Sequence, residues 1–195
     1  MTNALENISK ALAQEGLEGQ KAAPVEKWNP PYCGDIDMRI GRDGLWYYMG
    51  TPIGRMALVK LFASVLLQDE EGKTYLVTPV EKIGIIVEDG HFLGVEMRVE
   101  GVNETQIISI RTQTEEWVTI GKNHPLSFRP DQIGKGEIGN IVPYVHMRGR
   151  LECRINRPVF YDLIELSVER KIENINWLGI WSSGLFFPMI ETHLL

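Results

Sequence analysis

The pattern of hydrophobic and polar positions predicts a β-hairpin at the start of the folded body. Residues 36–40 read IDMRI, in which apolar and charged side chains alternate with the period of a half-buried strand. The turn sequence RDG at residues 42–44 separates this run from the aromatic run LWYYM at residues 45–49. Two strands joined by a short turn are therefore expected here.

The hydrophobic spacing then changes to that of a helix. Apolar residues recur at i, i+3, i+4 and i+7 from Leu58 to Val65, and Thr51 and Pro52 precede them with the chemistry of an N-cap and a first helical position. The pattern predicts a helix over residues 52–67. Short β-type runs follow at 74–78, 82–87, 91–99, 106–111 and 117–120.

The last third of the chain repeats this order. Strands are predicted at 142–147 and 151–155, a helix begins at Arg157-Pro158, and Ser182-Ser183-Gly184 has the composition of a hairpin turn. At an offset of 106 residues only three identities align the two parts. The shared order of elements, rather than those identities, therefore supports a duplication.

These elements predict an α+β fold of two small strand-rich halves related by duplication. Each half holds a β-hairpin, a helix that begins at a proline, and further strands. We expect the first half to cover residues 32–101 and the second half residues 102–195. Residues 1–31 are expected to form an N-terminal amphipathic helix over 3–15, followed by a linker rich in glycine and proline.

Composition narrows the class of protein without naming a chemistry. The 195 residues carry a formal net charge of -6, with 44% hydrophobic and 24% charged residues, which excludes collagen and coiled coil. The N-terminus has no signal-peptide pattern and the longest apolar run is too short to cross a bilayer, so a cytoplasmic protein with no membrane contact is expected. Cys33 and Cys153 lie far apart and form no metal or redox motif.

Basic residues gather in the second half of this acidic chain. The residues between 146 and 157 include four arginines: Arg148, Arg150, Arg154 and Arg157. Guanidinium groups bind phosphate and carboxylate groups through paired hydrogen bonds, although a solvated strand face explains the same pattern. A sequence pI of 5.3 argues against a nucleic-acid polymer as the partner.

Catalytic motifs are absent or out of context. The sequence contains no GxSxG and no HExxH, and no cofactor or metal is expected. Residues 134–139 read GKGEIG, but Pro143 stands where the helix of a dinucleotide site would run. We interpret this segment as a loop.

The chain nevertheless resembles a known family over its length from about Trp28. The segments that carry the resemblance are DGLW (43–46), TPIGR (51–55), LVKLFASVL (58–66), LVTPVEK (76–82), VED (87–89), HPL (124–126), PYV (143–145) and WSSG (181–184). They are similar to the bacterial domain-of-unknown-function family 1285 (DUF1285). Residues 90–92, Gly-His-Phe, depart from the Ala-Pro-Phe that this family usually has after the Glu-Asp pair.

The resemblance implies a fold and a context, but no established activity. It implies a duplicated α+β core and a C-terminal half similar to a pleckstrin-homology-like fold. It further implies a nucleotide-like ligand at the interface of the halves, in signal transduction.

We therefore expect a non-enzymatic sensing or signal-transduction protein that binds a small anionic, nucleotide-like ligand between its halves. The candidate residues are Arg55, at a helix N-terminus, with Arg111, Arg148 and Arg150 for charge, and Trp46, Tyr144 and Trp181 for stacking. A protein-interaction module that uses the same arginines and aromatic residues is an alternative. A third interpretation is a hydrolase that uses Glu81 or Glu88. Separately, the strand edges expected in such a fold favour a homodimer.

Overall fold

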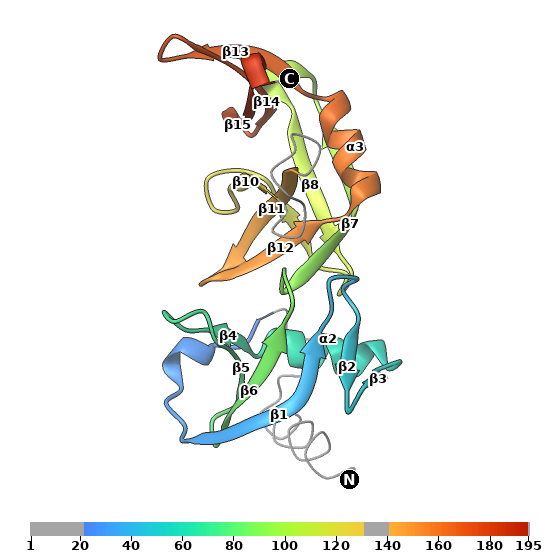
Figure 1. The fold of residues 1–195 in the computed structure, drawn as a ribbon, viewed down its shortest axis with the longest axis vertical. Helices are drawn as coiled ribbons and strands as arrows, with labels where there is room; N and C mark the ends of the chain where they lie inside the picture. The colour runs from blue at the N-terminus through green and yellow to red at the C-terminus, as the bar shows by residue number, and fades with distance from the viewer. Residues whose placement is uncertain (1–21, 131–140, 195) are drawn as a thin grey trace. The chain divides into compact units, whose positions relative to one another are not determined.

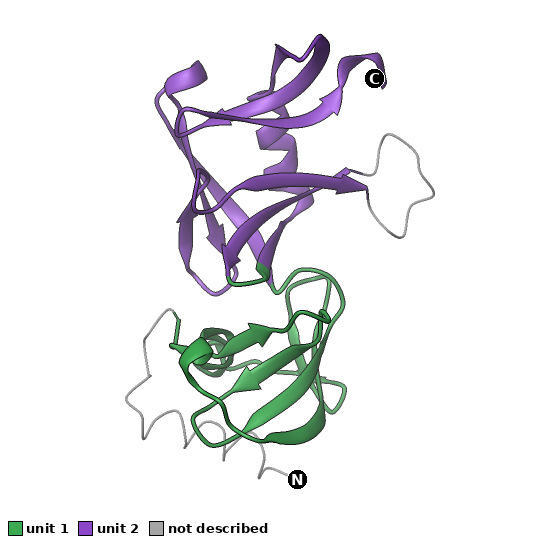
Figure 2. Cartoon of the chain, turned by 90° about the vertical axis from the view of Figure 1, so that its left-hand side faces the viewer, with its two compact units in different colours: residues 1–91, 149–151 green, residues 92–148, 152–195 purple. Residues whose placement is uncertain are grey.

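The computed structural model describes residues 22–130 and 141–194, which form two compact units (Figures 1 and 2). Unit 1 consists of the chain up to His91 together with Gly149–Leu151, and unit 2 consists of Phe92–Arg148 and the chain from Glu152 onward. The helix predicted over 3–15 and the loop predicted at 134–139 lie outside the described residues.

Unit 1 is one mixed sheet with a single α-helix among its described residues. Its elements are η1 (Val25–Lys27), β1 (Tyr32–Ile40), β2 (Trp46–Tyr48), β3 (Thr51–Pro52), α2 (Met56–Ser64), β4 (Leu66–Gln68), β5 (Thr74–Val77) and β6 (Lys82–Val87). The strand order is β3-β2-β1-β6-β5-β4. The predicted hairpin is confirmed as β1 and β2, and β1 pairs in parallel with β6.

The helix of unit 1 is shorter than the predicted range of 52–67. Thr51 and Pro52 form β3, which pairs with Tyr48 and Tyr47 of β2. A proline is tolerated there because β3 is an edge strand and needs no further donor. The helix begins at Met56, after Arg55 as its N-cap residue, and ends at Ser64 because the chain then enters β4.

Part of the segment predicted as a linker, residues 16–31, is packed in the core of unit 1. Ala23 and Val25 are each only 7% exposed, and the Ala23 backbone N–H donates to the Ser64 carbonyl over 2.9 Å. The folded body of unit 1 therefore includes Ala23 and Val25, which precede the predicted start at Tyr32. Small apolar side chains before the first strand carry too weak a periodic signal to predict this contact.

Unit 2 contains two sheets and the helix α3 (Arg157–Glu165). Sheet B has the order β10-β11-β12-β7-β8-β9 and sheet C the order β13-β14-β15. Their strands are β7 (Phe92–Glu100), β8 (Ile107–Thr112), β9 (Trp117–Thr119), β10 (Leu126–Pro130), β11 (Ile141–Arg148), β12 (Leu151–Ile155), β13 (Val168–Ile172), β14 (Ile175–Ser182) and β15 (Leu185–Glu191), with the short 3-10 turns η2 (Asn103–Thr105) and η3 (Thr192–Leu194).

The sequence predictions for unit 2 are largely confirmed. α3 starts where Arg157-Pro158 predicted a helix, with the Asn156 side chain accepting the Val159 N–H over 3.0 Å as its N-cap. Ser183 and Gly184 form the two-residue turn between β14 and β15, with φ of 53° and 72°. Left-handed φ at both turn positions matches the right-handed twist of the flanking strands.

The division between the units falls at His91/Phe92 instead of the predicted 101/102. The reason is β7, which pairs with β8 and β12 and so belongs to the second unit. Each unit contains a hairpin, then a helix, then three strands. In unit 1 the strands after the helix, β4 to β6, join the sheet of the hairpin, whereas in unit 2 the strands after the helix, β13 to β15, form a separate sheet. The duplication therefore stays a prediction that rests on element order.

Sheet C is attached to sheet B through the buried hydroxyl of Ser182. This hydroxyl accepts the Ile108 backbone N–H over 3.0 Å and donates to the Ile120 carbonyl over 2.7 Å. Gln106 adds a bond from its side-chain amide to the Trp181 carbonyl over 2.7 Å. Ile180 of β14 is 0% exposed and so belongs to the core of unit 2. None of the described helices is long and apolar enough to span a membrane.

Replacing Ser182 with alanine should destabilise the protein, because the buried Ile108 N–H loses its acceptor. We expect Ser182→Ala to lower the free energy of unfolding by about 1–3 kcal/mol, measured by urea denaturation. Ser127→Ala is the control, because Ser127 is exposed and its hydroxyl makes only a long 3.5 Å contact with the Tyr144 carbonyl, so the expected change is within about 0.5 kcal/mol. Equal stability of both variants would show that the junction does not depend on the hydroxyl.

Candidate functional site

Three of the predicted arginines are paired with carboxylates. The Arg111 Nε lies 2.6 Å from a Glu96 oxygen in unit 2, and the Arg150 guanidinium lies 3.0 Å from Glu70 in unit 1. The Arg148 guanidinium lies 3.5 Å from Glu116 in unit 2. The sequence predicted the arginines, whereas it did not predict their acidic partners, because these are distant in the chain.

The predicted aromatic residues occupy three different environments. Trp46 is 1% exposed and stacks on Phe62 of α2 with ring centroids 6.2 Å apart, so its ring belongs to the core of unit 1. Tyr144 is 9% exposed and lies beneath the Arg129 guanidinium, 3.9 Å from the ring centroid. Trp181 is half-buried, which makes it the most accessible of the three predicted aromatic residues.

The structure distributes the seven predicted residues over both units. Unit 1 holds Arg55, Trp46 and Arg150, while unit 2 holds Arg111, Tyr144, Arg148 and Trp181. Arg55 is exposed at the N-terminal end of α2, and its side chain makes no capping bond.

Arg148, at the end of β11, is the predicted arginine that is most shielded from water. Its side chain is 24% exposed and that of Glu116 is 19% exposed, and its guanidinium lies 5.3 Å from the centroid of the Phe92 ring. Burial lowers the pKa of Arg148, and the charge of Glu116 only partly opposes this. Cys153 is also buried. Its burial, with a smaller contribution from the charge of Glu116, raises the pKa of its thiol, so the thiol stays protonated.

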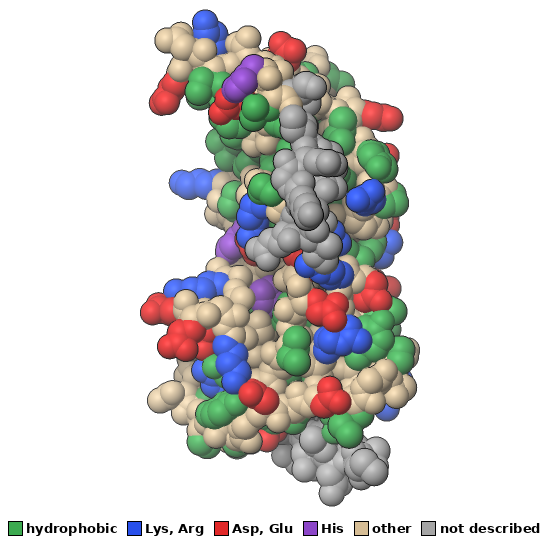
Figure 3. Space-filling view, viewed as in Figure 1, with side chains coloured by type: hydrophobic (Ala, Val, Ile, Leu, Met, Phe, Trp, Pro, Cys, Tyr) green, Lys and Arg blue, Asp and Glu red, His purple; other side chains and the backbone are tan. Residues whose placement is uncertain are grey.

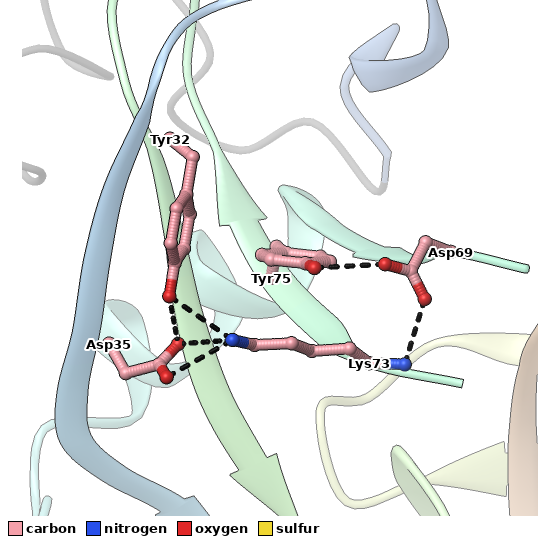
Figure 4. A network of polar contacts seen from close by, with 5 residues as sticks. All are labelled: Tyr32, Asp35, Asp69, Lys73 and Tyr75. Atoms are coloured by element: carbon pink, nitrogen blue, oxygen red, sulfur yellow. Dashed lines mark hydrogen bonds and ion pairs between the residues drawn. The ribbon is translucent and has the colours of Figure 1, made fainter. Parts of the chain in front are cut away.

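Unit 1 contains a polar network that the sequence analysis missed (Figure 4). The Lys73 ammonium donates to Asp35 over 2.8 Å and to the Tyr32 hydroxyl over 3.1 Å, and that hydroxyl donates to Asp35 over 2.7 Å. The Tyr75 ring meets the Tyr32 ring edge-on at 6.1 Å and donates its hydroxyl to Asp69 over 2.8 Å. The Lys82 ammonium covers the Tyr75 ring at 3.8 Å from the centroid.

The network fixes the charges of its members. The Lys73 hydrogen bond, followed by that from Tyr32, lowers the pKa of Asp35, and Asp35 in turn raises the pKa of Lys73. Burial and the bond to Asp69 raise the pKa of Tyr75. A lysine held as a cation and a tyrosine held as a neutral phenol are poor general bases, so the network is suited to holding structure.

A glycine makes room for this network. Gly84 of β6 stands opposite Asp35 of β1, and a Cβ at Gly84 would occupy the position of the Asp35 carboxylate. Sequence alone offered no signal for this, because a glycine inside a strand pattern fits many local contacts.

Sheet C presents an aromatic surface around a cation. The Arg170 guanidinium lies 4.5 Å from the Trp181 ring centroid and 5.5 Å from that of Phe186, and the two rings meet edge-on at 5.4 Å. Gly179 lets the Phe186 ring lie across the strand, because a Cβ there would overlap the ring. We call Arg170, Trp181 and Phe186 the aromatic face of sheet C.

Charge elsewhere is balanced locally. Figure 3 shows lysine and arginine side chains interspersed with aspartate and glutamate over the face that it draws. Within residues 22–130 and 141–194, no three histidine, cysteine or acidic side chains come together as a metal site. The side chains of Thr74 and His91 are both buried and lie 3.1 Å apart. This contact joins β5 to His91, the last residue of the main segment of unit 1.

Family models match almost all of the described chain. Residues 23–90 match "Domain of unknown function (DUF1285), N-terminal domain", and residues 91–189 match "Protein of unknown function (DUF1285), C-terminal domain". The boundary between these matches lies one residue from the division between the two units.

Two crystal structures are similar to this one. A DUF1285 family protein from Silicibacter pomeroyi DSS-3 shares 44% identity and a TM-score of 0.80, over 94% of this chain and 96% of that chain. A DUF1285 family protein from Shewanella baltica OS155 shares 22% identity and a TM-score of 0.50, over 66% of this chain and 90% of that chain, so it bears on the fold alone. A search among curated proteins found no match.

The Asp35 carboxylate should make stability depend on acid. Its pKa in the folded state lies below the ordinary 3.8, so its contribution is present above that pH and is lost as the pH falls through the folded value. On acidification below about pH 4, the wild type should lose thermal stability more steeply than Asp35→Asn.

Two further variants separate the network from general acid effects. Gly84→Ala should reproduce the flatter profile of Asp35→Asn, because its Cβ displaces the carboxylate. Asp37→Asn removes an exposed carboxylate from the same strand and should keep the wild-type profile. Parallel profiles for all four proteins would contradict the assignment.

Proposed function

This chain belongs to the DUF1285 family, a family of unknown function, and we propose that it is a non-enzymatic binding protein that takes a small anion at Arg148. The observation that carries the proposal is a guanidinium held at low exposure beside an aromatic ring, with burial lowering its pKa. An anion that reaches this guanidinium would interact with it more strongly than in open water, because the position is shielded.

Shielding from water favours Arg148 over the other candidate arginines. The Arg148 side chain is 24% exposed, against 32% for Arg111 and 53% for Arg150. Electrostatic interactions strengthen as water is excluded, so a phosphate or carboxylate that reaches the accessible part of the Arg148 guanidinium would interact with it more strongly than with an exposed arginine.

Glu116 sets the selectivity of such a site. Its carboxylate repels an incoming anion and competes for the same guanidinium, so a ligand must offer more charge or more donors and acceptors than a simple salt ion. A phosphate ester meets this requirement through its several oxygens and its charge.

The nucleotide part of the proposal rests on the family resemblance. It favours a phosphate carried by a nucleotide, a role in cytoplasmic signal transduction, and a pleckstrin-homology-like fold for unit 2 within a duplicated core. A ligand held between the two halves stays a prediction of the sequence.

Binding is favoured over hydrolysis by the setting of the candidate carboxylates. Glu88 accepts from the Arg39 guanidinium over 2.7 Å and from the Arg42 backbone N–H over 3.1 Å. Glu81 closes the turn that begins at Thr78, whose hydroxyl accepts the Glu81 N–H over 3.1 Å. Both residues have local structural partners that account for their positions.

A second candidate function is a protein-interaction module, favoured by the aromatic face of sheet C. Tryptophan and arginine are the usual anchors of protein interfaces. Val168 and Ile175, which lie on the same face of the sheet by register, are 37% and 40% exposed and extend the apolar surface. A protein partner that brings apolar side chains and a carboxylate toward Arg170 fits this surface.

The anion site is tested by thermal unfolding with inorganic phosphate and with nucleotides, against sodium chloride at equal ionic strength. The wild-type Tm should rise with ligand concentration, Arg148→Met should abolish the rise, and Arg129→Met should keep it. Glu116→Gln should tighten binding about fivefold, because it removes the competing carboxylate. No rise for any ligand, or a rise retained by Arg148→Met, would rule the site out.

The interaction module is tested by affinity capture with the dialysed protein. A stoichiometric protein partner should be retained by the wild type and lost with Trp181→Ala. Trp117→Ala is a matched control, since Trp117 of sheet B also lies under an arginine, with Arg98 at 4.1 Å from its ring centroid. Equal capture by both variants would remove the aromatic face from the interaction.

A further inference from the structure

β13 is an exposed strand at the edge of sheet C, in unit 2. Figure 1 shows it at the outer end of this unit, with β14 and β15 on one side of it. Val168 to Lys171 are all exposed, and β13 pairs with β14 alone among the described strands. An edge strand of this kind offers its outer backbone groups to another strand.

The turn geometry identifies which backbone groups point outward. Glu173 and Asn174 form a two-residue turn with φ of 47° and 68°, so Ile172 and Ile175 are a hydrogen-bonded pair. Hydrogen bonding alternates along an antiparallel ladder. The N–H and C=O groups of Glu169 and Lys171 therefore face away from β14.

The sequence of β13 is complementary to itself. Arg170 is the central residue of β13. Its neighbours are the acidic Glu169 and the basic Lys171, and the aliphatic residues Val168 and Ile172 lie beyond them. An antiparallel second copy centred on Arg170 sets Glu169 opposite Lys171, and Val168 opposite Ile172, on both sides of the two-fold axis. Opposite charges in directly facing positions stabilise a pair of strands.

We infer that β13 pairs with β13 of a second copy of this chain, in antiparallel register centred on Arg170, to form a continuous six-stranded sheet. The outward backbone groups of Glu169 and Lys171 meet their counterparts in this register and form about four main-chain hydrogen bonds. The inference goes beyond the interaction-module candidate, because the edge of β13, and not the aromatic face, makes the contact.

The central pair of arginines is compatible with this register. Two like charges face each other at Arg170, but each guanidinium lies over the Trp181 and Phe186 rings of its own sheet. A register centred on Glu169 or on Lys171 would place that residue opposite its own copy, with no aromatic ring beneath it to offset the like charges. Either register would also lose the two pairs of Glu169 with Lys171.

The other described strand edges are less suited to pairing. β3, β4 and β9 each have three residues or fewer. β15 contains Pro188, which lacks a backbone donor, and β10 ends in Pro130. β13 has five residues and no proline.

The test measures the self-association of the full chain by sedimentation equilibrium over a range of concentrations. The wild type should form dimers, and Lys171→Glu or Glu169→Lys should weaken dimerisation roughly tenfold, because each makes two like-charge pairs across the axis. The double variant Glu169→Lys with Lys171→Glu should restore wild-type dimerisation, since the swap recreates both pairs. Lys122→Glu, at an exposed loop position, is the charge-matched control and should dimerise as the wild type does.

A backbone variant tests the ladder itself. Lys171→Pro removes an outward N–H and leaves the bonds to β14 intact, so it should abolish dimers while the thermal unfolding transition stays near that of the wild type. A monomeric wild type, or single charge variants that dimerise normally, or a double swap without rescue, would overturn the inference. Monomers together with capture of another protein that depends on Trp181 would overturn the second copy as partner and leave the interaction module standing.

Discussion

The two sheets of unit 2 are joined by hydrogen bonds that gather around the buried hydroxyl of Ser182. The Ser182 hydroxyl accepts the Ile108 backbone N–H and donates to the Ile120 carbonyl. A side chain therefore satisfies main-chain groups of sheet B that a neighbouring strand would otherwise pair with. Buried backbone groups must find partners, and a small residue with both a donor and an acceptor satisfies two of them at one point. This contact sets which face of β14 is inward, because Ile180 fills the interior while Trp181 and Arg170 lie outside.

The formal charge of -6 has little meaning without the positions of the charges. Three of the four candidate arginines, Arg111, Arg148 and Arg150, already meet an acidic side chain of their own unit. Exposed pairs of this kind contribute little to stability, yet they neutralise the positive patch that the sequence suggested. Arg148 differs because it is shielded from water, and shielding strengthens any remaining electrostatic interaction.

The sequence predicted the elements that repeat a local pattern. The β1–β2 hairpin, α3 and the turn at Ser183-Gly184 follow from alternation, from a proline at a helix start and from a residue that tolerates positive φ. It failed where tertiary contacts override local preference. Thr51-Pro52 has the form of a helix start but serves as an edge strand, and Ala23 has no periodic pattern but packs against the end of α2. Residue type alone selects the seven candidate residues, which stay a prediction. Their contacts, such as Glu116 beside Arg148 and Arg170 beside Trp181, join positions that no sequence spacing links.

Parallel pairing has a consequence for how the chain reaches this structure. In unit 1 the first strand, β1, lies beside the last, β6, and in unit 2 β7 lies beside β12, so each main sheet closes only when segments from opposite ends of a long stretch meet. Such closures cost chain entropy before they return contact energy. The order of synthesis therefore matters, because β7 emerges well before β12 and must wait with an unsatisfied edge while the intervening strands are made.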